Sequence, residues 1–138
     1  MFEKIQHIGY LVGDLAAAVQ WFKAGFGGEN VGGGNVNSSV AVPGGGRNTF
    51  IHFGQVEVEL CEPSDTSKLP TNTLVMHHVG YVVSDIQAVA PQLQAKGFKF
   101  ASDEPSTNSQ GQQVCYFDPA TTNGFLMHLT QQPSKPSA

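Results

Sequence analysis

The chain has 138 residues, of which 40% are hydrophobic and only 13% charged, and its net charge is −4. This balance excludes a nucleic-acid-binding protein, because such proteins need clustered Lys and Arg to neutralise phosphates. No apolar run approaches the roughly 18 residues of a membrane span, and the N-terminus lacks a signal-peptide pattern. We therefore expect a cytoplasmic protein that has neither nucleic acid nor a membrane as a partner.

The first predicted elements are a strand and a helix. Residues 4–12 are rich in β-branched and aromatic side chains and predict a strand. Asp14 predicts the N-cap of a helix, because its carboxylate can accept hydrogen bonds from the free N–H groups of the first turn. Three residues spaced three to four positions apart form one apolar helical face: Leu15, Val19 and Phe22. Gly25 or Gly27 would end this helix.

Glycine dominates the next segment. Residues 28–35 are expected to form a loop, and the two glycine clusters do not match a phosphate-binding fingerprint, because no Lys-Ser/Thr pair or helix start follows them. Short strands are then expected at 36–42, 47–53 and 55–62. Residues 43–46 are expected to form a turn between the first two of these strands.

The second half of the chain repeats the first. HVGYVVSDI, which starts at His78, matches HIGYLVGDL, which starts at His7, position by position. Two copies of one module predict a duplicated fold. The expected class is α+β, with two tandem βαβββ modules that form a curved mixed sheet around a groove. The modules are expected at about 3–63 and 74–132, within a single domain over 1–132, with 133–138 as a flexible tail.

The second module is expected to follow the same order of elements. A strand is expected at 75–83, then a helix that is capped by Asp85, runs to Lys96 and stops at Gly97. Further strands are expected near 98–101, 112–117 and 124–130. Pro91 falls inside the second helix and is tolerated in a first turn, so this helix is expected to start late or to begin with a separate turn.

Four side chains of metal-ligand type occupy equivalent positions in the two modules. His7 precedes His78 by 71 residues, and Glu59 precedes His128 by 69. Because side chains alternate between the two faces of a strand, Glu59 and His128 are expected on the face opposite the apolar side chains, toward the groove. Imidazole and carboxylate groups are ligands for divalent transition metals. The repeat therefore predicts one metal site made of His7, Glu59, His78 and His128.

The remaining candidate residues receive structural interpretations. Alternation sends His77 to the face opposite His78, His52 has no counterpart in the second module, and Glu57 aligns with Leu126 and is expected to be solvated. Cys61 and Cys115 lie far apart in the chain and are expected to be buried free thiols.

Motifs along nearly the whole chain resemble the vicinal oxygen chelate superfamily, which includes glyoxalase I, methylmalonyl-CoA epimerase, bleomycin-resistance proteins and extradiol dioxygenases. The motifs are IQHIGYLVGDLAAAVQWF, VEVELCEP, MHHVGYVVSDI and CYFDPATTNGFLMHL, and the last two are most similar to methylmalonyl-CoA epimerase and its relatives. In that family the ligands are His, Glu or Gln, His and Glu. His7, Glu59 and His78 match the first three, and His128 replaces the last.

Two further features depart from the family's epimerase. That enzyme has a catalytic carboxylate near the strand after the first helix, whereas residues 35–42 contain none. Arg47 is the only arginine of the chain that could pair with the phosphates of coenzyme A.

The resemblance implies one divalent ion (Zn, Ni, Co, Fe or Mn) and a metal-dependent isomerase, epimerase or lyase that acts on a small carbonyl or thioester compound through a metal-stabilised enolate. Glu59 and His128 are the candidate catalytic bases. One alternative is a ring-cleaving dioxygenase-like enzyme with non-haem Fe(II), because His7, His78 and Glu59 form the two-histidine, one-carboxylate set of such enzymes. The other is a small-molecule binding or resistance protein without catalysis. A homodimer is expected.

Overall fold

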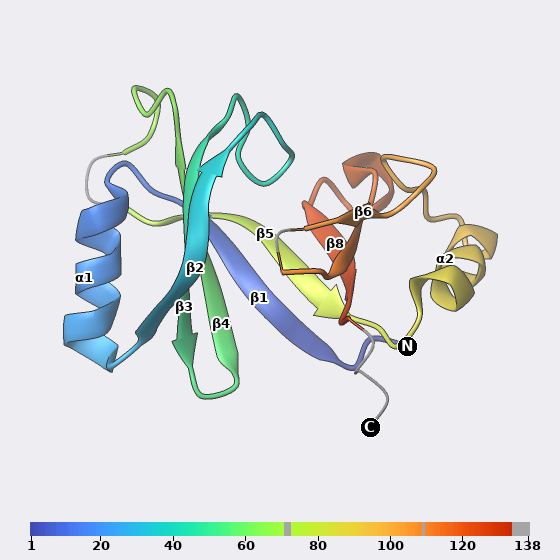
Figure 1. The fold of residues 1–138 in the computed structure, drawn as a ribbon. Coiled ribbons are helices and arrows are strands. Elements are labelled where there is room, and N and C mark those ends of the chain that lie inside the picture. Colours follow the sequence, from blue (N-terminus) through green and yellow to red (C-terminus); the bar gives the residue numbers. More distant parts are fainter. Residues whose placement is uncertain (71–72, 109, 134–138) are drawn as a thin grey trace. The chain divides into compact units, whose positions relative to one another are not determined.

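The computed structural model describes residues 1–70, 73–108 and 110–133 (Figure 1). The elements of the first module are β1 (Lys4–Leu11), α1 (Leu15–Phe26), β2 (Glu29–Val36), β3 (Gly46–Phe53) and β4 (Val56–Pro63). Those of the second are β5 (Val75–Val82), α2 (Ile86–Ala95), β6 (Ser106–Thr107), β7 (Gln113–Tyr116), the 3-10 helix η1 (Pro119–Thr121) and β8 (Met127–Gln131). Both modules thus have the predicted βαβββ order, and the predicted α+β class is confirmed.

The described residues divide into two compact units. The first unit is His7–His78, and the second combines Met1–Gln6 with the described residues from Val79 onward. The predicted tail falls almost entirely on 134–138, which lie outside the described residues.

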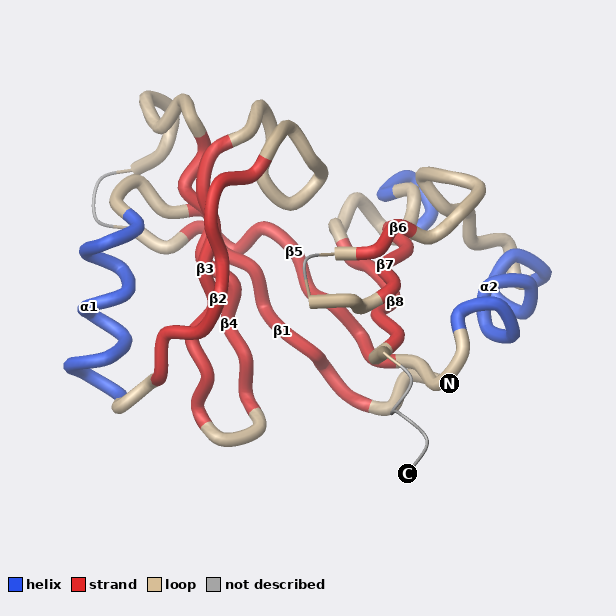
Figure 2. The backbone as a smooth tube through the Cα atoms, in the orientation of Figure 1, coloured by secondary structure: helices blue, strands red, loops and turns tan. Residues whose placement is uncertain are grey.

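In the first unit the strand order is β2-β3-β4-β1; Figure 2 colours these strands red and helix α1 blue. β1 pairs with β4 in parallel, with Gly9 opposite Glu59, and β3 is antiparallel to both β2 and β4. Helix α1 packs its predicted apolar face against β3 and β4. The core consists of Val12, Leu15, Phe22, Ile51, Val58 and Leu60. Because these residues take one face of β4, the opposite face is left for Glu57, Glu59 and Cys61.

The second unit repeats this pattern with the order β5-β8-β7-β6. β5 pairs with β8 in parallel and places Gly80 opposite His128, as Gly9 lies opposite Glu59 in the first unit. Helix α2 packs on a separate core formed by Val83, Ile86, Val89, Leu93, Cys115, Phe117 and Leu129. The predicted equivalence of Glu59 and His128 within their modules is therefore confirmed by the strand register.

Each helix is held at its start by two side chains. The Asp14 and Asp85 carboxylates accept hydrogen bonds of 3.0 Å from first-turn N–H groups, as predicted for both N-caps. A second acceptor comes from the end of the last strand of the same module: Glu62 accepts from the N–H of Leu15 at 2.7 Å, and Gln131 accepts from that of Ile86 at 2.8 Å. The duplication thus extends to polar contacts that anchor each helix to its sheet.

The prediction of a loop at 28–35 and a strand at 36–42 was wrong, because β2 occupies Glu29–Val36 instead. The glycines permit a bulge that fits β3: an added Cβ on Gly33 would lie 2.2 Å from the Asn48 carbonyl oxygen, and φ there is +96°. Asn30 donates to the hydroxyl of Thr49 at 2.7 Å and helps to hold the strand. Residues 43–44 form a turn just before β3, within the segment where a turn was predicted.

Three predictions for the second module were also wrong in detail. Helix α2 begins directly after Asp85 and contains Pro91 as its sixth residue. Because Pro91 has no backbone N–H, the Gln87 carbonyl lacks the hydrogen bond that it would accept in a regular helix. Gln87 and Pro91 are both exposed, so water can hydrogen-bond to this carbonyl instead. The predicted strand at 98–101 is reduced to a single bridge between Phe100 and Phe117. The predicted strand at 124–130 starts only at Met127, because a turn precedes it in which the Thr122 hydroxyl donates to the Phe125 carbonyl at 2.7 Å.

Cys61 and Cys115 are buried free thiols, as predicted. Among the described residues no helix has both the length and the apolar character that crossing a membrane requires.

Candidate metal centre

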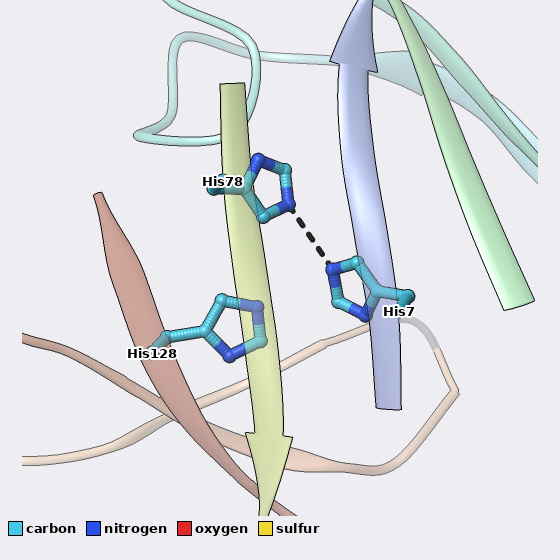
Figure 3. Close-up of side chains that lie close together, drawn as sticks. All are labelled: His7, His78 and His128. Carbon is cyan, nitrogen blue, oxygen red and sulfur yellow. Dashed lines mark hydrogen bonds between the residues drawn. The ribbon is translucent and has the colours of Figure 1, made fainter. Parts of the chain in front are cut away.

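Three of the four predicted ligands meet in the first unit. His7 comes from β1, Glu59 from β4 and His78 from β5. The Nε2 atoms of His7 and His78 are 3.1 Å apart, as Figure 3 shows by a dashed line. Glu59 Oε1 lies 2.9 Å from His78 Nε2 and 3.6 Å from His7 Nε2. Three donor atoms from three strands therefore face one another.

These separations fit the requirements of a divalent ion. Nitrogen and oxygen ligands about 2.1 Å from such an ion lie about 3.0–3.4 Å from one another in tetrahedral or octahedral geometry. The three observed separations run from 2.9 to 3.6 Å. All three residues are buried, with His78 at 0%, Glu59 at 5% and His7 at 6% relative exposure. A buried set of two imidazoles and one carboxylate has the composition and spacing to hold a metal ion.

The protonation states also suit metal binding. Burial lowers the pKa of His7 from 6.5 to about 4, although the Glu59 carboxylate works in the opposite direction. Burial alone would raise the pKa of Glu59, but its hydrogen bond to His78 and the nearby imidazoles lower it to about 2. At neutral pH, His7 is thus a neutral imidazole and Glu59 an anion, which are the forms that bind metals.

Partners outside the three donor atoms fix the side chains. Asn48 Nδ2 donates to Glu59 Oε2 at 2.9 Å, which leaves Oε1 toward the two histidines. The Cys61 thiol also forms a hydrogen bond with Glu59. Burial and the neighbouring Glu59 carboxylate raise the pKa of the Cys61 thiol. His77 Nδ1 lies 2.9 Å from His78 Nδ1. Such outer partners orient metal ligands and fix their tautomers.

The fourth predicted ligand, His128, belongs to β8 of the second unit, and Figure 3 labels it on that strand. Its side chain is buried at 2% relative exposure. Its Nδ1 lies 2.9 Å from the Thr130 hydroxyl, and its ring is 4.8 Å from that of Tyr116 on the neighbouring strand β7. Tyr116 pairs with His128 in register as Phe50 pairs with Glu59, so the duplicated positions have duplicated aromatic neighbours.

Sequence reasoning missed two contacts of the remaining candidates. Alternation assigned His77 to the face away from His78, yet the two rings meet through their Nδ1 atoms. Alternation describes the direction of Cβ, and an imidazole is long enough to reach back around the strand. The prediction that Glu57 is solvated was wrong: its side chain is 14% exposed, and Oε1 lies 3.1 Å from His52 Nε2. These two residues face each other across the β3–β4 pair.

A close approach at Gly9 yields a first testable prediction. An added Cβ there would lie 2.1 Å from His78 Cε1 and 2.5 Å from both ring nitrogens. Gly9→Ala should therefore displace the imidazole and destabilise the protein by about 1–3 kcal/mol, measured by urea denaturation without added metal. Gly13→Ala is the matched control, because nothing lies within 4 Å of its added Cβ. Equal stability of the two variants would contradict this packing.

A duplicated βαβββ module with paired imidazoles and a carboxylate defines a protein of the vicinal oxygen chelate class. The family model of the Glyoxalase/Bleomycin resistance protein/Dioxygenase superfamily matches residues 6–116. The chain therefore belongs to this superfamily, and the predicted resemblance is confirmed.

Solved structures with the same fold include methylmalonyl-CoA epimerases. A single-residue variant of the Streptomyces coelicolor enzyme, in complex with 2-nitronate-propionyl-CoA, is 26% identical, with a TM-score of 0.79 over 97% of this chain and 100% of that chain. The Mycobacterium tuberculosis epimerase is 18% identical, with a TM-score of 0.80 over 96% and 90% of the two chains. A hypothetical protein from Bacillus halodurans is 19% identical, with a TM-score of 0.74 over 98% of each chain. Because the Mycobacterium tuberculosis and Bacillus halodurans proteins are less than 20% identical to this chain, they show only that the fold is shared.

No curated protein sequence matches the chain significantly. The expected homodimer and the cytoplasmic location stay predictions.

Proposed function

We propose that this protein is a metal-dependent isomerase, epimerase or lyase that acts on a small carbonyl or thioester compound. His7, Glu59, His78 and His128 would hold one divalent ion of the Zn, Ni, Co, Fe or Mn group. The observation that carries the proposal is that three donor atoms of buried residues, His7 Nε2, His78 Nε2 and Glu59 Oε1, lie 2.9–3.6 Å from one another. Superfamily membership and the likeness to epimerases support an isomerase-type activity.

His128 is proposed as the fourth ligand on the evidence of the repeat. Glu59 stands opposite Gly9 on β1, two residues after His7, and His128 stands opposite Gly80 on β5, two residues after His78. The contact of its Nδ1 with Thr130 leaves Nε2 as the nitrogen for a ligand.

A bound divalent ion would act as a Lewis acid that polarises a carbonyl oxygen and acidifies the adjacent C–H. The protein must then supply a base. With its pKa lowered to about 2, Glu59 is a weak base at neutral pH and is better suited to be a permanent ligand. We therefore assign the movement of the proton to His128, which would have to leave the ion to take up the proton on Nε2, with Thr130 orienting its ring through Nδ1, and keep Glu59 as the second candidate.

The substrate class follows from what the chain shares with the epimerases and what it lacks. The Streptomyces coelicolor enzyme binds 2-nitronate-propionyl-CoA, which supports an acyl thioester or a related carbonyl compound. The only arginine, Arg47, is already paired with Glu62 at 2.8 Å, and 35–42 contains no carboxylate. A small carbonyl compound without a nucleotide therefore fits the charges of the chain better than coenzyme A does.

A second candidate function has one observation in its favour. The three donors that meet in the first unit are two histidines and one carboxylate, the set used by non-haem Fe(II) oxygenases. Dioxygen consumption with a catechol-type substrate would identify this function, since an isomerase uses no oxygen.

Metal content tests the proposed function. Elemental analysis of the untagged, dialysed protein is expected to find about one equivalent of a divalent transition metal per chain. His128→Ala should retain less than about a tenth of it. The loaded protein should then exchange the C–H next to a carbonyl with deuterium from D2O, measured by NMR on a panel of 2-oxo compounds and acyl thioesters. If the protein contains no metal, even after divalent ions are added back, the proposed metal-dependent activity is wrong, and a small-molecule binding protein without catalysis is the remaining function.

A further inference from the structure

His77 is not among the proposed ligands, yet its ring meets the ring of His78. The two Nδ1 atoms are 2.9 Å apart, and the rings are nearly perpendicular, at 89°. The other nitrogen of His78, Nε2, points to His7 and Glu59. Both ring nitrogens of His78 are thus engaged, one on each side.

We propose that His77 is a positioning residue that, by accepting a hydrogen bond at Nδ1, stabilises the tautomer of His78 that binds a metal through Nε2. This inference rests on the proposed function. A hydrogen bond between two Nδ1 atoms contains one proton, so one ring must donate it and the other must accept it. When His78 carries the proton on Nδ1, the lone pair of its Nε2 is directed at His7 and Glu59. His77 must then accept at Nδ1 and carry its own proton on Nε2.

The opposite tautomer also fits the contacts. In it His78 Nε2 donates to Glu59 Oε1 across 2.9 Å, and His77 donates its Nδ1 proton to His78. Metal loading must convert this state to the first. One proton then crosses from His77 Nδ1 to His78 Nδ1, His78 Nε2 gives its proton to water, and His77 Nε2 takes one from water. His77 is only partly buried, so its ring lies closer to solvent than that of the fully buried His78.

Two substitutions separate this role from simple packing. Asn places a carbonyl oxygen close to the position of Nδ1, so His77→Asn keeps an acceptor for His78. Phe keeps the size of the ring and removes the acceptor. We expect His77→Phe to weaken Co2+ or Zn2+ binding about 10–100-fold, and His77→Asn to restore it to within about 3-fold of the unaltered protein. Competition titration with a chromophoric chelator measures both affinities.

The matched control is His52→Phe. It removes another histidine by the same substitution, in a strand of the first unit where the ring contacts Glu57 and none of the proposed ligands. Its metal affinity is expected to be unchanged. Equal affinity of His77→Phe and the unaltered protein would overturn the inference.

Long-range 1H–15N NMR of the metal-free protein is a second readout that does not depend on loading. The inference requires complementary tautomers, with the proton on Nδ1 of one ring and Nδ1 of the other ring bare. Protons on Nε2 of both rings would overturn it. Failure of the unaltered protein to bind any metal would instead overturn the proposed function, and the NMR result would still decide whether the two histidines share a proton. If His77→Phe fails to fold, His77→Asn and the NMR measurement decide.

Discussion

Glu59→Gln is expected to weaken divalent-metal binding by more than about 100-fold, since loss of an outer partner alone typically costs 10–100-fold. Glu59 is the only anion among the proposed ligands, and its Oε1 lies 2.9 Å from His78 Nε2 and 3.6 Å from His7 Nε2. The amide keeps the shape of the side chain and can still contact Asn48, but it removes the negative charge that offsets the ion. Titration with Zn2+ or Co2+ against a competing chelator measures the change.

Glu57→Gln is the matched control for this experiment. It makes the same chemical change two residues earlier on the same face of β4, where the carboxylate contacts His52. Its metal affinity should stay within about 2-fold of the unaltered protein, as is usual for a change outside the ligands and their partners. Similar losses in both variants would show that general charge, and not ligation by Glu59, governs binding.

The ligand candidates could be predicted because the sequence contains the module twice. A single strand histidine carries little information, but His7 and His78 share a nine-residue motif, and Glu59 and His128 occupy equivalent positions in the two copies of the module. Strand alternation then predicted correctly that Glu59 lies opposite the apolar side chains of β4. Duplication and alternation can both be read from the sequence without knowledge of long-range strand pairing, which is why both modules and the three donors that meet could be predicted from them.

The predictions that were wrong concern segments whose structure depends on contacts with other parts of the chain or on side-chain orientation. The glycine run at 32–34 has low strand propensity, but β3 offers hydrogen-bond partners to β2, and Gly33 fits against the Asn48 carbonyl where no side chain could. Pro91 was expected to delay a helix, but the Asp85 cap and the apolar face of α2 outweigh one missing hydrogen bond. The His77–His78 contact depends on ring orientation, which no periodicity encodes.

The metal-free protein is expected to lose stability steeply as the pH falls from 7 to 4, with His7 as a main cause. Burial lowers the pKa of His7 from 6.5 to about 4, so between these values the unfolded chain binds a proton at this residue and the folded protein does not. Stability therefore rises with pH across this window. The contribution of His7 amounts to a loss of about 2 kcal/mol between pH 7 and pH 5, and about 3 kcal/mol by pH 4.

His7→Gln tests this contribution, because the amide does not titrate. The free energy of unfolding in urea, measured at several pH values on chelator-treated protein, should fall less steeply in the variant, by about 2 kcal/mol between pH 7 and pH 5. The Glu59 carboxylate, whose pKa is lowered from 4.5 to about 2, adds its own loss mainly below about pH 4.5, so the comparison between pH 7 and pH 5 reports little of it. Parallel curves for the two proteins would mean that His7 takes up its proton in the folded state as readily as in the unfolded chain. Burial would then not lower the pKa of His7 below 6.5, which would contradict the buried environment described for the proposed metal centre.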